Sequence, residues 1–144
     1  MPCLVVRDEA GGLRASFPLW GGRGFAISYR HSVTRQPCIE RFRSGPGLRI
    51  LLFSTEFQGS GAGLPFADEG GSVTIRDGMV VIDGMSRLFS TIHYAPLPLT
   101  EHRLVIGGRG YDLLGLVGGR GQAVVAIERC GPAGLAAAFE GRFR

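Results

Sequence analysis

Hydrophobic and polar residues alternate with a period of two along most of the chain. Such alternation predicts β-strands that bury one face and expose the other. The clearest alternating stretches are residues 13–19, 25–33, 48–52 and 72–76. Shorter continuous apolar runs at 79–82 and 123–127 fit strands that are covered on both faces. A helical period of 3.6 is not the dominant pattern, so the sequence predicts an all-β protein.

Turn signals separate these segments. Asp77-Gly78 lies between two strand-like stretches, and this dipeptide favours a type I′ hairpin. Gly-Gly-Arg-Gly occurs three times, at 21–24, 107–110 and 118–121. We interpret these copies as turns, because RNA-binding Arg-Gly-Gly tracts are disordered and closely repeated. We therefore expect one domain over residues 1–130, an antiparallel β-sandwich or barrel of about ten or eleven short strands.

The last residues differ in character from the rest. Residues 131–144 form an Ala-rich extension that begins Gly-Pro. Leu135, Phe139 and Phe143 are spaced four apart, as on one face of a helix. We expect a short C-terminal helix that docks on an open end of the domain. The alternative is an exposed attachment point for a partner or a membrane surface.

Composition and charge narrow the function classes. The chain has 144 residues, 44% of them hydrophobic, which suits one domain with its own core. All 16 basic residues are arginine and they are dispersed, so the net charge of +4 does not predict nucleic-acid binding. No apolar stretch is long enough to span a membrane, and the first residues do not resemble a secretory signal. These features predict a cytoplasmic location.

Three cysteines stand at positions 3, 38 and 130, without a Cys-x-x-Cys pair. The odd number argues against a disulfide framework and against a Cys-rich zinc site. We interpret each as a small, buried apolar residue. Pairing of Cys3 with Cys130, near opposite ends of the chain, stays open.

The richest candidate chemistry lies between Tyr29 and Phe42. A turn centred near residues 34–35 would place His31 opposite Cys38 and Tyr29 opposite Glu40. All four side chains would then share one face of the hairpin, because strand side chains alternate.

Four interpretations of this cluster are open. The first is a metal site of His31, Cys38 and Glu40, completed by His93 or His102. The second is acid–base catalysis by His31 and Glu40. The third is a buried polar network that fixes the hairpin register, and the fourth is a binding site for a small polar ligand. A dyad of Ser32 and its neighbour His31 is excluded, because adjacent strand residues point to opposite faces.

A glycine-rich stretch follows at residues 57–65. Gly61 and Gly63 would let backbone N–H groups converge on an anion. A phosphate-binding P-loop would need a lysine and a following helix, whereas Pro65 comes here instead. A rigid turn is the alternative.

Two strings together suggest a family. They are Tyr29-x-His31-Ser32-Val33-x-x-x-Pro37-x-x-Glu40 and Phe57-x-x-x-Gly61-Ala62-Gly63-Leu64-Pro65. They resemble the bacterial family called domain of unknown function 1850, and His102-x-Leu104 is similar to a weaker C-terminal match. The resemblance covers roughly residues 4–129. Cys38 stands where the family pattern has valine, which weakens the metal hypothesis.

The resemblance implies a role but no reaction. Family members are encoded beside TRAP-type solute transporters of the TAXI class, so the resemblance implies a non-enzymatic accessory module that contacts the permease or senses its solute. The competing hypothesis is a β-barrel enzyme or a ligand- or metal-binding barrel that uses His31 and Glu40. We assign no catalytic residue, metal or cofactor. The candidate ligand-binding residues are Tyr29, His31, Ser32, Glu40, Gly61, Gly63 and His102.

Overall fold

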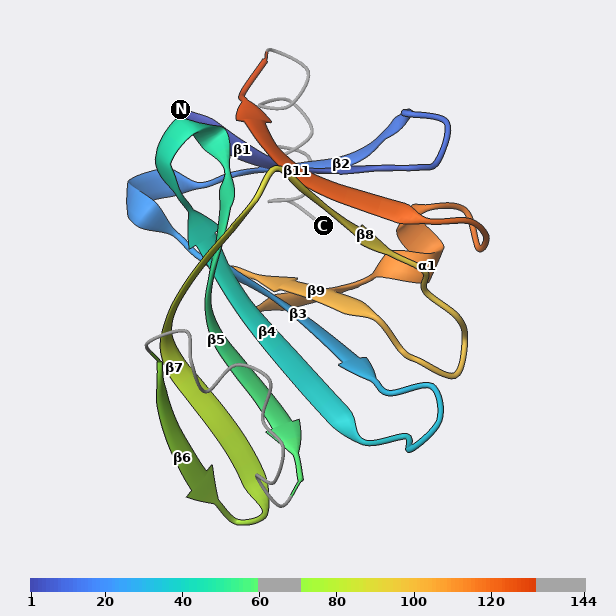
Figure 1. Ribbon diagram of the computed structural model, residues 1–144. Helices are drawn as coiled ribbons and strands as arrows, with labels where there is room; N and C mark the ends of the chain where they lie inside the picture. The colour runs from blue at the N-terminus through green and yellow to red at the C-terminus, as the bar shows by residue number, and fades with distance from the viewer. Residues whose placement is uncertain (60–70, 132–144) are drawn as a thin grey trace.

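A computed structural model describes residues 1–59 and 71–131 of the chain (Figure 1). Eleven strands lie within these residues. They are β1 (Pro2–Arg7), β2 (Leu13–Pro18), β3 (Phe25–Arg30), β4 (Pro37–Ser44), β5 (Ile50–Gln58), β6 (Ser72–Arg76), β7 (Met79–Phe89), β8 (Thr91–Tyr94), β9 (Arg103–Ile106), β10 (Arg109–Asp112) and β11 (Ala123–Arg129). The other elements are two 3₁₀ turns, Trp20–Gly22 and Pro46–Leu48, and helix α1 (Leu113–Leu116).

The strands form two antiparallel sheets that face each other (Figure 1). One sheet has four strands in the order β2-β1-β11-β8, and the other has seven in the order β10-β9-β3-β4-β5-β7-β6. The prediction of an all-β, sandwich-like fold is confirmed, and the barrel alternative is not. The predicted helix of the extension 131–144 lies outside the described residues, and the predicted domain boundary at residues 130–131 lies at their end.

The core lies between the sheets, where the inward positions of both are apolar. Leu4 and Val125 come from the smaller sheet, and Ile27, Phe42 and Ile82 from the larger one, each at most 1% exposed. Burying a side chain of this size contributes about 1.5–3 kcal/mol to folding. This contribution explains why strict alternation in the sequence predicted the strands.

The predicted turns form as expected. Asp77 and Gly78 have φ values of 52° and 79°, as a type I′ turn between β6 and β7 requires. In the second Gly-Gly-Arg-Gly copy, Gly107 and Gly108 have φ values of 59° and 76° and connect β9 to β10. The first and third copies lie outside strands, whereas Arg109 and Gly110 of the second copy belong to β10.

A β-bulge changes which face of β5 is buried. Leu52 pairs with Phe42 and Ser54 with Arg41, so Phe53 is an extra residue between them. Strict alternation from Ile50 would point Ser54, Glu56 and Gln58 into the core. The bulge reverses the phase, and Thr55 takes the inward position opposite Glu40.

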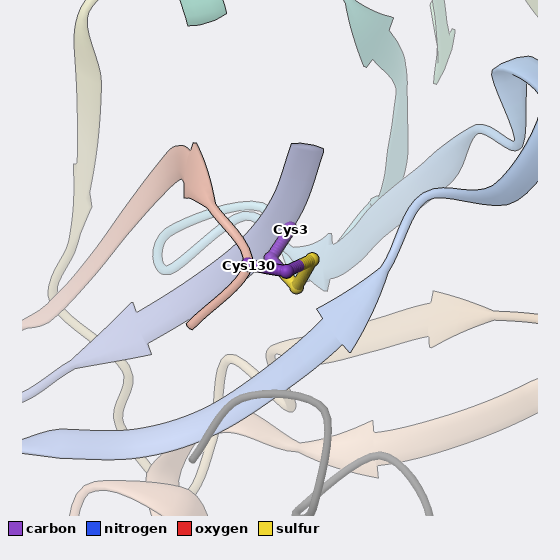
Figure 2. The surroundings of a disulfide bond; sticks show 2 residues. All are labelled: Cys3 and Cys130. Carbon is purple, nitrogen blue, oxygen red and sulfur yellow. A yellow bond between two sulfur atoms is a disulfide. The ribbon is translucent and has the colours of Figure 1, made fainter. Parts of the chain in front are cut away.

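Cys3 and Cys130 form a disulfide, with Cα atoms 5.0 Å apart (Figure 2). Pro2 lies opposite Arg129 in the pairing of β1 with β11, and Cys130 N–H donates to the Met1 carbonyl. The interpretation of these two cysteines as unpaired apolar residues is wrong. The sequence could not decide it, because only the sheet topology makes the first and last strands neighbours. Cys38 is free.

No helix in the described parts of the chain is long and apolar enough to cross a membrane.

Candidate functional site

The β3–β4 hairpin has a different register from the one predicted. Tyr29 lies opposite Cys38, and Ile27 lies opposite Glu40. The register is displaced by two residues because a six-residue loop, 31–36, connects the strands. A shift of two preserves the faces, so Tyr29, Cys38 and Glu40 still share the inward face. That part of the prediction holds, while the predicted position of His31 is wrong.

His31 lies in the exposed loop and caps its turn. Its Nδ1 accepts weak hydrogen bonds from the N–H groups of Val33 and Thr34, at 3.3 and 3.5 Å. Its backbone carbonyl accepts from Arg35 N–H at 2.8 Å. Ser32 is exposed in the same loop. Because the His31 side chain bonds to N–H groups of its own loop, it does not reach Glu40, which points between the sheets.

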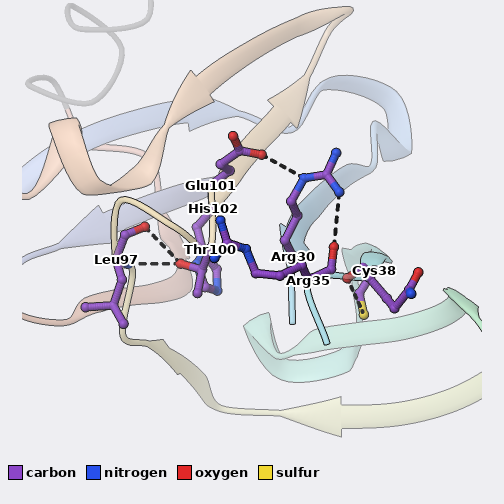
Figure 3. Close-up of polar contacts among 8 residues, drawn as sticks. Arg30, Arg35, Cys38, Leu97, Thr100, Glu101 and His102 are labelled. Carbon is purple, nitrogen blue, oxygen red and sulfur yellow. Dashed lines mark hydrogen bonds and ion pairs between the residues drawn. The ribbon is translucent and has the colours of Figure 1, made fainter. Parts of the chain in front are cut away.

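Ion pairing and backbone contacts hold this loop beside the segment that precedes β9 (Figure 3). Arg30 Nε donates to Glu101 at 2.9 Å, and Arg30 Nη1 donates to the Arg35 carbonyl at 3.1 Å. Arg30 N–H also donates to the Thr100 carbonyl at 2.7 Å. The end of the β3–β4 hairpin therefore has a fixed position relative to residues 100–102.

His102 occupies the inward position that was predicted for His31. Its ring stacks on Tyr29, with centroids 4.9 Å apart and planes 11° apart. Its Nδ1 lies 2.8 Å from the Thr100 hydroxyl, which itself donates to the Leu97 carbonyl (Figure 3). The Thr100 hydroxyl and His102 Nδ1 therefore share a hydrogen bond whose donor is set by the tautomer of the ring. Burial lowers the pKa of His102 from its ordinary 6.5, so the neutral ring is favoured.

Glu40 connects the two sheets. Tyr94, on β8 of the smaller sheet, donates from its hydroxyl to Glu40 Oε1 at 3.1 Å. Burial raises the pKa of Glu40, and the hydrogen bond from Tyr94 opposes that shift in part. Burial, together with the nearby Glu40 charge, also raises the pKa of Tyr94 and of Tyr29, so both phenols stay protonated.

The free thiol of Cys38 lies beside this group. It is half-buried, and its Sγ is 4.0 Å from the Gln36 carbonyl. Burial and the neighbouring Glu40 raise the pKa of Cys38, which disfavours the thiolate that nucleophilic attack or metal binding requires. We refer to six residues as the inter-sheet cluster: Tyr29, Cys38, Glu40, Tyr94, Thr100 and His102.

The geometry does not support the metal site that was one of the four open interpretations. His31 is in the loop, and His93 is exposed on β8, with its Nδ1 3.3 Å from Gln122 Oε1. Within residues 1–59 and 71–131, no three His, Cys, Asp or Glu side chains are grouped so that they could hold a metal ion. Gly61 and Gly63, the predicted anion-binding glycines, lie outside the described residues.

Sequence reasoning missed two members of the cluster. Thr100 follows the string Leu-Pro-Leu, and nothing in its local sequence indicates a role. Tyr94 ends a short strand of the other sheet, so only the tertiary fold brings it to Glu40. A buried carboxyl at an inward strand position nonetheless requires a donor, and that requirement was a signal to search for a phenol elsewhere in the chain.

Comparison with known proteins identifies a family. The family model described as "Domain of unknown function (DUF1850)" matches residues 25–113. The chain belongs to this DUF1850 family. The match includes β3 to β10 and every member of the inter-sheet cluster. The searches of curated proteins and of solved structures each found no match.

Proposed function

We propose that this DUF1850 protein is a non-enzymatic accessory module for TRAP-type solute transport of the TAXI class. The observation that carries the non-enzymatic part is the Glu40–Tyr94 hydrogen bond, which joins the two sheets at 3.1 Å. In this proposal the inter-sheet cluster holds the sandwich together, and the binding function belongs to the outer surface.

The groups of the cluster are poorly suited to catalysis. A general base needs a free acceptor atom, a pKa near the working pH and a route to substrate. Glu40 Oε1 instead accepts from Tyr94 and His102 Nδ1 bonds the Thr100 hydroxyl, so both side chains are fixed by partners inside the protein. The raised pKa of Cys38 keeps this thiol protonated. These contacts favour a structural polar network over an acid–base or nucleophilic site.

The transporter link rests on the family resemblance of the two sequence strings. The DUF1850 description names no reaction, which is compatible with an accessory role. The partner in this proposal is a TAXI-type TRAP permease or the solute that it carries.

The location that we propose differs from the sequence-based expectation. A disulfide between the first and last strands persists in oxidising compartments, such as a bacterial periplasm, and is rare in a reducing cytoplasm. We therefore place the working protein on the oxidising side of the membrane, where it would meet the extracytoplasmic face of a permease.

Co-expression with a TAXI-type TRAP permease tests the proposal. The two proteins should co-elute from a size-exclusion column in mild detergent, and deletion of the gene should reduce solute uptake. Native mass spectrometry of the purified protein tests the alternative of an enzyme or metal-binding domain, because it detects a bound metal or ligand directly. Separate elution with unchanged uptake would overturn the transport role, and a stoichiometric bound metal would favour the alternative.

A further inference from the structure

The outer face of the larger sheet carries a groove, on the opposite side from the inter-sheet cluster. Its cavity volume is about 460 Å³, and strands β4 to β7 supply its lining. This volume is within the range of small-molecule sites. None of the residues that line the groove belongs to the inter-sheet cluster.

Three aligned residues form one row across this groove. Arg41 on β4 lies opposite Ser54 on β5, and Ser54 lies opposite Asp83 on β7. All three line the cavity. Because neighbouring strands are about 4.8 Å apart, the row places a cation and a carboxylate on either side of a hydroxyl.

Ser54 is the unusual member of the row. It is 1% exposed, and its Oγ has no hydrogen-bond partner. A buried hydroxyl without a partner costs about 1–3 kcal/mol, and native proteins rarely keep one without a reason. The bulge at Phe53 creates this arrangement, since it turns Ser54 away from the core and into the floor of the groove.

The charged groups of Arg41 and Asp83 can still form hydrogen bonds or ion pairs with a ligand. Arg41 Nη2 pairs with Glu56 Oε2 at 3.1 Å, which leaves other guanidinium N–H groups available. The Asp83 carboxylate makes no hydrogen bond or ion pair with another residue of the described ranges, while its backbone belongs to the β7 pairings. The groove contains two arginines and three carboxylates in total, so its charge disfavours phosphates and other polyanions.

We propose that this groove binds a small zwitterion with an ammonium and a carboxylate group, such as a free α-amino acid. The ammonium pairs with Asp83, and the carboxylate accepts from Arg41. Ser54 lies between Arg41 and Asp83 in the row, and its hydroxyl donates to the carboxylate of the ligand. The buried hydroxyl thereby gains the hydrogen-bond partner that it lacks. Charge-assisted hydrogen bonds of this kind are stronger than neutral ones.

Isothermal titration calorimetry with glycine and L-alanine tests the site, with acetate and methylammonium as ligands that carry one charge each. Each amino acid should bind at one site per chain. The single-charge ligands should bind at least about tenfold more weakly, because each loses one charge-assisted contact. Asp83→Asn and Ser54→Ala should each weaken amino-acid binding by about tenfold or more.

Arg43→Gln and Asp112→Asn are matched controls, because they remove the same charges outside the groove lining. Their binding should equal that of the wild type. Arg41→Gln should also weaken amino-acid binding by about tenfold or more. Glu56→Gln releases Arg41 from its ion pair and should tighten binding, which keeps the test decisive if Arg41→Gln does not fold. The proposal would be overturned if the titration showed no saturable heat up to about 10 mM amino acid, or if the wild type and Asp83→Asn bound equally well. The experiment needs no transporter, so its outcome is independent of the proposed transport role.

Discussion

At the residue scale, one phenol donates to the half-buried carboxyl of Glu40. Tyr94 reaches it from the opposite sheet, and His102 packs against both Tyr94 and Tyr29, with centroid distances of 5.6 and 4.9 Å. The contribution of the Glu40–Tyr94 hydrogen bond to the free energy of unfolding therefore requires both side chains. A buried acceptor that loses its donor retains its full cost of desolvation.

Replacement of the phenol should reveal this coupling. We expect Tyr94→Phe to lower the free energy of unfolding by about 1–3 kcal/mol, because Glu40 is left without its donor. In a Glu40→Ala background, which has no acceptor, the same change should cost less, and a double-mutant cycle by urea denaturation measures the difference. Tyr111→Phe is the control, with an expected change within about 0.5 kcal/mol. Equal costs of Tyr94→Phe in both backgrounds would show that the pair is not coupled.

The protonation of Glu40 should make stability depend on pH. Burial raises its pKa above the ordinary 4.5, so the folded state holds this proton more tightly than the unfolded state. The stability that Glu40 contributes is therefore full below about pH 4.5 and is lost as pH rises through the folded pKa. Unfolding free energies of the wild type and Glu40→Gln, measured from pH 4 to pH 8, should separate as pH rises, with the variant increasingly favoured. A constant difference over that range would contradict the assignment.

The candidate histidine shows the limit of sequence reasoning at this scale. Alternation correctly placed Tyr29, Cys38 and Glu40 on one face, because the period of a strand is fixed. It extended that face to His31, since nothing in the sequence marks where β3 ends. The inward ring is His102, which lies 73 residues after Tyr29 in the chain. Local pattern cannot supply a contact between such distant segments.

At the scale of elements, the turns determine which residues reach each face. The two-residue turn at Asp77-Gly78 was predictable, because only a few residue types tolerate positive φ at both positions. The six-residue loop of the β3–β4 hairpin was not, because Arg35 adopts a φ of 62° without being glycine or asparagine. The bulge at Phe53 also has no sequence signature, although it determines which side of β5 carries Ser54.

The β6–β7 turn offers a test of backbone conformation alone. A Cβ at Gly78 would meet no other atom within 4 Å, so only its φ of 79° opposes substitution. We expect Gly78→Ala to lower the free energy of unfolding by about 1 kcal/mol. Asp77→Gly, at the adjacent position with positive φ, should change it by less than about 0.5 kcal/mol. Chemical denaturation of both variants measures these changes. An unchanged free energy of unfolding in Gly78→Ala would show that the turn does not require glycine at this position.

At the scale of the whole molecule, the smaller sheet closes the sandwich through β1 and β11 (Figure 1). The alternating pattern predicted the fold class, because burial of one strand face is a local property. The order of strands was not predictable, since it depends on which distant segments pack together. That order alone makes Cys3 and Cys130 neighbours, which cysteine counting could not reveal.

The disulfide should stabilise the fold mainly through the unfolded chain. It links residues 127 positions apart, so it removes a large loop-closure entropy from the unfolded state. We expect Cys3→Ala with Cys130→Ala to lower the free energy of unfolding by about 3–5 kcal/mol. Dithiothreitol should reduce the wild type to the stability of this double variant and leave the variant unchanged. Cys38→Ala is the control, because a protein with that substitution keeps the bridge and should respond to reductant as the wild type does. Three free thiols in the native protein, or a wild-type stability that reductant does not alter, would contradict the bridge and with it the proposed oxidising compartment.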